Sequence, residues 1–191
     1  MLYYAPQIWC SDNTDAVERL KIQYGTSFAY PMSSISAHVS VCPNHQNGRV
    51  TPFKTRGICA MQGAFGYELD LSKLSDEDKE EVRRQVKFYR ENYQVIQSGD
   101  YYRITSPWEN HDVTAWSYVA QDASKAILAA VFTDLHGNPV AERVRWRGLD
   151  EKAVYEIDGR EYTGAALMHG GYLLPVPQCN YDSCMLVAGR K

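Results

Sequence analysis

Hydrophobic and polar positions follow two different patterns along the chain. Up to about residue 98, short apolar runs alternate with segments of helical spacing. The runs predict strands at 5–10, 34–41 and 65–71, and the spacings predict helices at 15–24, 51–62 and 75–98. Alternation of this kind is typical of parallel strands that are joined by crossover helices.

From about residue 100 onward, the pattern changes to short β-type runs that are separated by turn signals. Ser106-Pro107 and Asp158-Gly159 are two of these signals. Such a succession predicts an antiparallel β-sandwich. The candidate strands cover residues 101–105, 115–120, 126–132, 143–147, 153–157, 171–174 and 184–187.

The expected fold class is therefore α/β followed by β, with one domain over residues 1–99 and a second over residues 100–191. A chain of 191 residues, 45% of them hydrophobic and 23% charged, is long and apolar enough to bury a core. We expect no nucleic-acid partner, because 20 Lys and Arg stand against 23 Asp and Glu. We expect no membrane span either, because no apolar run approaches about 18 residues.

Five cysteines at unrelated spacings do not predict a disulfide framework. We interpret them as reduced and mostly buried thiols. The first residues, MLYYAPQIW, lack the features of a secretory signal, so we expect a cytoplasmic protein. Because Met1 is followed at once by apolar and aromatic residues, the start is more typical of the middle of a domain than of its edge.

Asp12 is the first candidate for chemistry. It follows the predicted strand at 5–10, and side chains at the carboxyl ends of parallel strands face the active sites of β/α proteins. The alternative is that Asp12 and Asp15 only cap the helix that follows, as short polar side chains at helix starts often do. The spacing alone favours this structural interpretation.

Four segments resemble family 36 α-galactosidases. The stretch MLYYAPQIWCSDNTDAVERLKIQYGTS is similar to the region around the acid/base carboxylate of that family. The similarity continues through HVSVCPNHQNGRVTPFKTRG and GAFGYELDL, and more weakly through GLDEKAVYEIDGREYTGAALMHGGYLLP. It therefore covers nearly the whole chain.

The resemblance implies a retaining glycosidase that removes terminal α-linked galactose from oligosaccharides such as melibiose and raffinose. One carboxylate attacks the anomeric carbon, and a second, about 5 Å away, protonates the leaving oxygen and then deprotonates water. Asp12 matches this second residue, the general acid/base. Asp15 is the less favoured match, because it falls within the predicted helix. No cofactor and no metal are implied.

The resemblance also implies parts that this chain does not carry. The family's nucleophile belongs to a Trp-Asp motif, and no Trp here precedes an Asp. The three strand–helix units would be the last three of a (β/α)₈ TIM barrel, followed by the C-terminal sandwich. We therefore expect a C-terminal fragment that is inactive alone, while the full-length form would be a homo-oligomer. The alternative is a non-catalytic module that binds carbohydrate or supports the fold.

Other candidates are weaker. Cys42 and His45, with His38 and Cys59 nearby in sequence, could form a zinc site, but their spacing is irregular. His38 could contact substrate or be a satisfied polar residue. For the acidic residues Glu68 and Asp70 we favour structural hydrogen bonding over catalysis, and for Trp108, Trp116 and Trp146 we favour a place in the core over a sugar platform.

Overall fold

The computed structural model describes residues 3–138 and 140–191, and the chain divides into two compact units, residues 1–97 and 98–191. The first unit mixes helices with parallel strands, and the second is almost entirely antiparallel β-structure. Among the described residues, no helix is long and apolar enough to cross a membrane.

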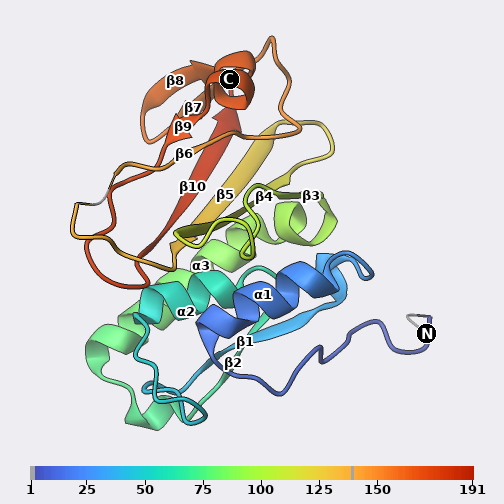
Figure 1. The fold of residues 1–191 in the computed structure, drawn as a ribbon. Helices are drawn as coiled ribbons and strands as arrows, with labels where there is room; N and C mark the ends of the chain where they lie inside the picture. Colours follow the sequence, from blue (N-terminus) through green and yellow to red (C-terminus); the bar gives the residue numbers. More distant parts are fainter. Residues whose placement is uncertain (1–2, 139) are drawn as a thin grey trace. The chain divides into compact units, whose positions relative to one another are not determined.

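The first unit is built on two parallel strands, β1 (Ser36–Ser40) and β2 (Ala64–Glu68), which pair residue for residue from Ser36 with Ala64 to Ser40 with Glu68. A third extended segment joins them through a parallel bridge between Ile8 and Ile35. Three helices complete the unit (Figure 1): α1 (Ala16–Thr26), α2 (Phe53–Ala60) and α3 (Asp76–Ser98).

The two faces of β1 differ in their side chains. Ala37 and Val39 are buried, together with Leu20 of α1 and Ile58 of α2. The alternate positions of β1 carry Ser36, His38 and Ser40, because successive side chains of a strand point to opposite faces. The apolar face is the core of this unit, and the other face is polar.

Local sequence accounts for the helix starts. Asp15 caps α1, and its carboxylate accepts a hydrogen bond from the backbone N–H of Glu18. At α3, the Ser75 hydroxyl accepts a hydrogen bond from the backbone N–H of Asp78 at 3.1 Å. Pro52 stands immediately before α2, where the missing N–H costs nothing.

The second unit contains a six-stranded antiparallel sheet in the order β3-β4-β5-β10-β7-β8 and a two-stranded sheet of β6 and β9. Alternate residues of β4 and β5 share one buried cluster with Val144 of β6 and with Trp146 and Leu174. Both sheets therefore contribute to one core. The strands are β3 (Asp100–Arg103), β4 (Val113–Val119), β5 (Lys125–Phe132), β6 (Arg143–Val144), β7 (Val154–Ile157), β8 (Arg160–Thr163), β9 (Tyr172–Leu173) and β10 (Ser183–Arg190).

The structure confirms an α/β unit followed by antiparallel β-structure and refines several elements. The predicted strand at 5–10 is reduced to the single bridge at Ile8. Each of the seven strands predicted after residue 100 overlaps an observed strand, but β8 was missed. Its residues Arg160–Thr163 are mostly exposed, so they carry no apolar run by which a strand could be recognised.

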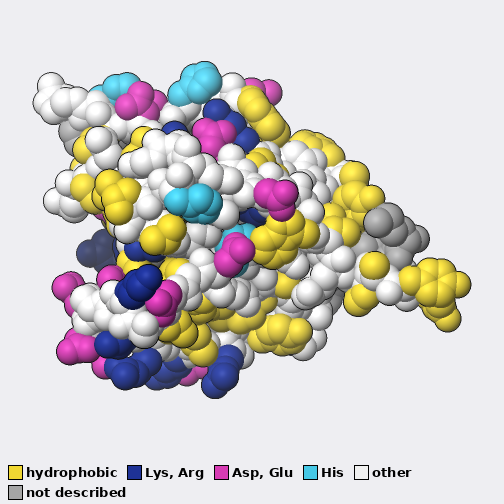
Figure 2. Space-filling view, turned by 90° about the horizontal axis from the view of Figure 1, so that it is seen from below, with side chains coloured by type: hydrophobic (Ala, Val, Ile, Leu, Met, Phe, Trp, Pro, Cys, Tyr) yellow, Lys and Arg dark blue, Asp and Glu magenta, His cyan; other side chains and the backbone are white. Residues whose placement is uncertain are grey.

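The cysteines are less buried than expected, and the two tyrosines near the start of the chain are exposed. All five cysteines are free thiols, but only Cys59 and Cys184 are buried and Cys179 is exposed. Tyr3 and Tyr4 are each 89% exposed and contact one another edge to face. Figure 2 shows hydrophobic side chains on the projecting N-terminal stretch, beside the grey atoms.

Candidate active site

One hollow of the first unit lies where its three parallel segments end. Its cavity has a volume of about 570 Å³. Ser40 is the last residue of β1, Glu68 is the last residue of β2, and Asp12 follows the segment that contains Ile8. Among the described residues, the cavity is lined by Trp9, Asp12, Thr14, Ser40, Val41, His45, Gln46 and Glu68. The carboxyl ends of parallel strands thus converge on one cavity, as they do at the active sites of β/α folds.

Asp12 presents its carboxylate at this cavity. The residue is exposed, and one oxygen, Oδ1, accepts a hydrogen bond from the indole Nε1–H of Trp9 at 3.1 Å. Among the described hydrogen bonds and ion pairs, Oδ2 has no partner. A carboxyl held by one oxygen and open at the other can exchange a proton with a molecule in the cavity.

The loop after β1 holds the backbone around Asp12. The side-chain amide of Gln46 donates to the carbonyl of Asp12 at 3.0 Å, and its oxygen accepts from the backbone N–H of Thr14 at 2.9 Å. Asn44, which is buried, donates to the Thr14 hydroxyl at 3.0 Å and accepts from the backbone N–H of Gln46. The main chain that carries Asp12 is therefore fixed by residues more than 30 positions away.

Asp15 has a different environment from Asp12. Its side chain is 2% exposed, pairs with the guanidinium of Arg49 and caps α1. Both interactions use its carboxylate oxygen Oδ2. Capping of the helix, which the sequence allowed for both aspartates, is therefore the role of Asp15, and the residue lies at the cap rather than inside the helix.

The buried side chain of Arg19 connects the Asp12 loop to β1. It is 4% exposed, and its guanidinium donates to the carbonyl of Ser11 at 2.9 Å and to that of Ser36 at 2.7 Å. Its Nε donates to the side chain of Gln23. A single buried side chain thus connects the residue before Asp12 to the first residue of β1.

Trp9 is stacked on His38. The two ring centroids lie 4.5 Å apart and the ring planes differ by 4°. The Nε2 atom of His38 lies 2.6 Å from Oε2 of Glu68, although the His38 side chain is only 6% exposed. Burial lowers the pKa of His38 from its usual 6.5, and the charge of Arg19 acts in the same direction, while the Glu68 carboxylate opposes both.

The other sequence candidates are distributed as follows. His38 lies behind Trp9 rather than in the cavity lining. The Asp70 carboxylate accepts from the backbone and hydroxyl of Ser72, which is the structural role that was expected. Glu68 contacts His38 and also lines the cavity.

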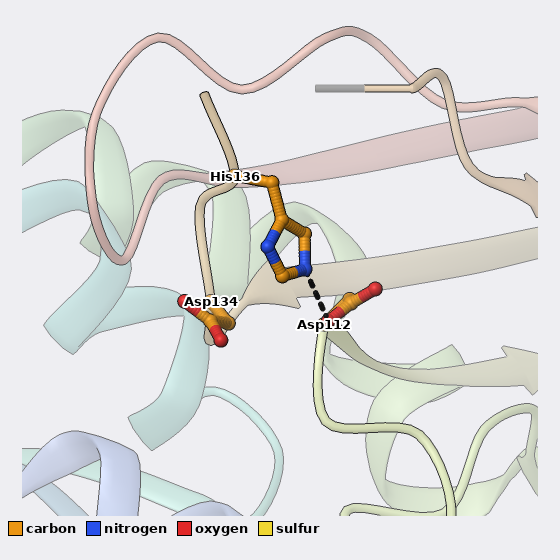
Figure 3. A group of neighbouring side chains, drawn as sticks. All are labelled: Asp112, Asp134 and His136. Atoms are coloured by element: carbon orange, nitrogen blue, oxygen red, sulfur yellow. Dashed lines mark hydrogen bonds and ion pairs between the residues drawn. The ribbon is translucent and has the colours of Figure 1, made fainter. Parts of the chain in front are cut away.

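The four residues considered for zinc do not form a ligand cluster in the described part of the chain. The Cys42 thiol lies 3.7 Å from the Thr51 carbonyl, and burial raises the pKa of the Cys59 thiol. A different group in the second unit, Asp112, Asp134 and His136, brings three potential ligand atoms within 4.8 Å of one another (Figure 3). Asp134 and His136 are exposed, and a hydrogen bond of 3.0 Å joins His136 to Asp112.

The tryptophans divide between core and surface. Trp116 and Trp146 are 2% and 1% exposed, which confirms the expected core position. For Trp108 that expectation was wrong, because its side chain is 51% exposed. It belongs to the turn between β3 and β4, where its ring is not enclosed by the sheet.

Two residues of the site were missed in the sequence, Trp9 and Gln46. Trp9 lies three positions before Asp12, which is a spacing at which a local hydrogen bond can form. Gln46 had only the signal of belonging to a polar loop between a strand and a helix.

Two family models match successive parts of the chain. The Melibiase model matches residues 1–99, and the model of the glycosyl hydrolase family 36 C-terminal domain matches residues 113–187. The chain belongs to glycoside hydrolase family 36. The bifunctional α-galactosidase/sucrose kinase AgaSK of Mediterraneibacter gnavus is 51% identical over 92% of this chain and 19% of its own length.

Solved structures of family 36 show the same fold over the whole chain. A variant of the α-galactosidase AgaA from Geobacillus stearothermophilus in complex with raffinose is 45% identical, with a TM-score of 0.97 over 100% of this chain and 27% of that chain. A second variant in complex with stachyose is 46% identical, with a TM-score of 0.96 over 100% and 26%. The chain spans about a fifth to a quarter of the length of the curated relatives it matches.

Proposed function

We propose that this chain is the acid/base part of a retaining α-galactosidase. In this proposal Asp12 is the general acid/base, and a nucleophilic carboxylate comes from a polypeptide segment outside these residues. The observation that carries the proposal is the exposed Asp12 carboxylate at a cavity formed by three parallel strand ends, in a chain of family 36.

The roles of Asp12 follow from its two oxygens. In the first step, the protonated carboxyl gives its proton to the leaving glycosidic oxygen while the nucleophile attacks the anomeric carbon. In the second step, the resulting carboxylate takes a proton from water, and that water displaces the nucleophile. Oδ1 is held by Trp9, and Oδ2 is the atom proposed to carry the proton.

The proposed substrate is an α-galactoside oligosaccharide. Complexes of the Geobacillus relative with raffinose and with stachyose support this class of ligand. In the same proposal, the Ile8 segment, β1 and β2 are the last three strands of a (β/α)₈ barrel, and residues 100–191 form a C-terminal β-sandwich domain.

A hybrid enzyme tests this function. Residues 1–191 replace the corresponding C-terminal part of the Geobacillus α-galactosidase, which has the same fold over the whole of this chain. We expect the hybrid to hydrolyse raffinose, and Asp12→Asn to lower kcat/KM for raffinose by about 10²–10⁴-fold, the usual contribution of general acid–base catalysis. Asp76→Asn is the matched control, because its carboxylate is fully exposed at the start of α3.

Azide distinguishes an acid/base from other roles. In Asp12→Ala, azide can take the place of water in the second step without needing a base, so an activated aryl α-galactoside should give α-galactosyl azide with retained configuration. A hybrid that is active while Asp12→Asn keeps full activity on raffinose would contradict the assignment. An azide product of inverted configuration would make Asp12 the nucleophile instead.

A further inference from the structure

Three side chains connect Asp12 to the end of β2. Trp9 donates to Asp12 Oδ1 at 3.1 Å, its ring is parallel to that of His38 at 4.5 Å, and His38 Nε2 lies 2.6 Å from Glu68 Oε2. The three residues come from three successive parallel segments, the Ile8 segment, β1 and β2. We propose that Trp9 is a positioning residue, which aims the Asp12 carboxyl at the leaving oxygen and is itself held by His38 and Glu68.

The exposure of Trp9 is the first reason for this role. Its side chain is 51% exposed to solvent. A fixed orientation ordinarily adds little stability for an indole on an exposed loop. Here the ring is fixed by the stack on His38, whose own side chain is 6% exposed. A buried histidine therefore supports an exposed tryptophan at the edge of the cavity.

The chemistry of the hydrogen bond is the second reason. The indole nitrogen is a donor only, so it can bind a carboxylate oxygen but cannot accept the acid's proton. Its hold on Oδ1 leaves Oδ2 as the oxygen that carries the proton. The indole thus selects which of the two oxygens exchanges the proton, and it restricts rotation of the carboxyl.

The backbone of Asp12 is secured independently of Trp9. Gln46 binds the Asp12 carbonyl, and Arg19 binds that of Ser11. Loss of the indole N–H should therefore free the carboxyl while the main chain stays in place. For this reason we expect substitution of Trp9 to change catalysis more than folding.

The proposal rests on the acid/base function of Asp12, and leaving-group dependence tests the two separately. Cleavage of raffinose needs protonation of a poor leaving group, whereas a dinitrophenyl galactoside leaves without it. In the hybrid enzyme, we expect Trp9→Phe to lower kcat/KM for raffinose about tenfold or more. We expect it to lower kcat/KM for the dinitrophenyl substrate less than about threefold, because a misplaced acid slows only the reaction that needs its proton.

A double-mutant cycle separates positioning from a general structural effect. If Trp9 acts through Asp12, Trp9→Phe in an Asp12→Asn background causes no further loss on raffinose. Glu68→Gln, which removes the charge beside His38, should show the same leaving-group dependence to a smaller extent. Trp108→Phe is the matched control, because that indole is also 51% exposed and should leave both substrates unaffected.

The outcomes are distinguishable. Equal losses on both substrates for Trp9→Phe, or additive losses in the cycle, overturn the positioning role while Asp12→Asn still shows leaving-group dependence. If Asp12→Asn itself lacks that dependence, the proposed function fails. Should Trp9→Phe not fold, benzothienylalanine at position 9 keeps the ring shape and stack without the N–H, and the same two substrates decide.

Discussion

Two neighbouring aspartates show how much a single side chain depends on its contacts. Asp12 and Asp15 are three residues apart at one helix start, yet one is exposed at a cavity and the other is buried against Arg49. The Arg49 pair and the Glu18 N–H use the carboxylate of Asp15, which leaves Asp12 as the carboxylate available for chemistry. The sequence allowed both to be caps, and only their tertiary contacts separate them.

The pKa values of two histidines are shifted in opposite directions. Burial lowers the pKa of His38 below 6.5, whereas the hydrogen bond to Asp112 raises the pKa of His136 above 6.5. NMR titration of the ring protons should show His38 losing its proton at lower pH than His136. Asp112→Asn should bring His136 back toward 6.5, and a His136 pKa unchanged by this substitution would contradict the assignment.

The same shifts set the sign of the pH dependence of stability. The folded protein disfavours the charged form of His38, so its contribution to the free energy of unfolding is present above pH 6.5 and is lost as the pH falls through its lowered pKa. The contribution of His136 has the opposite sign, since it is present below pH 6.5 and is lost as the pH rises.

Among the elements, those with a strong apolar pattern were predicted, whereas the mostly polar strand β8 was not. The helices and the apolar strands β1, β4 and β5 have a periodicity that adjacent residues reveal. Strand β8 is held by a hairpin with the adjacent β7, but its exposed residues carry no apolar run. The strand predicted at 5–10 is reduced to one bridge to Ile35. In the site, Asp12 follows from its place after a predicted strand, whereas Gln46 reaches it from 34 residues away.

Gly57 of α2 leaves room for the side chain of Gln85 of α3. A Cβ at this position would lie 2.2 Å from the side chain of Gln85, which is buried and bonded to Phe53 and Tyr67 and therefore cannot move freely. We expect Gly57→Ala to lower the free energy of unfolding by about 1–2 kcal/mol, because overpacking outweighs the gain in helix propensity.

Urea unfolding measures this effect, and Gly170→Ala is the control. Gly170 ends a helical turn, Ala166–Gly170, and a Cβ there meets nothing within 4 Å. An unchanged or raised stability for Gly57→Ala would show that Gln85 can move aside.

At the scale of the whole molecule, the unpaired edges of the parallel strands bear on whether the chain associates with other chains. Among the described residues, β2 pairs only with β1, and the Ile8 segment pairs only at Ile35. Unpaired strand edges favour association with other chains. On the polar face of β1, the Ser40 hydroxyl and the Nδ1 atom of His38 are buried without a hydrogen-bond partner in the described structure.

We therefore expect the 191-residue chain to associate by itself. Size-exclusion chromatography with light scattering should show a mass that increases with concentration. Adding the N-terminal three-quarters of a family 36 enzyme should replace this association with a defined complex, because in the proposed barrel its strands would pair with both edges. A sharp monomeric peak with cooperative melting would contradict this expectation.

Arg19 has a consequence for protein engineering. Its guanidinium, with the amides of Gln46 and Asn44, braces the Asp12 loop using only residues between positions 8 and 68. In the proposed function Asp12 is the proton donor, and a donor whose supports all lie within residues 8–68 can be transplanted as a block. A designer who exchanged this block between homologous scaffolds would transfer the donor with its supports, instead of having to rebuild them in the recipient.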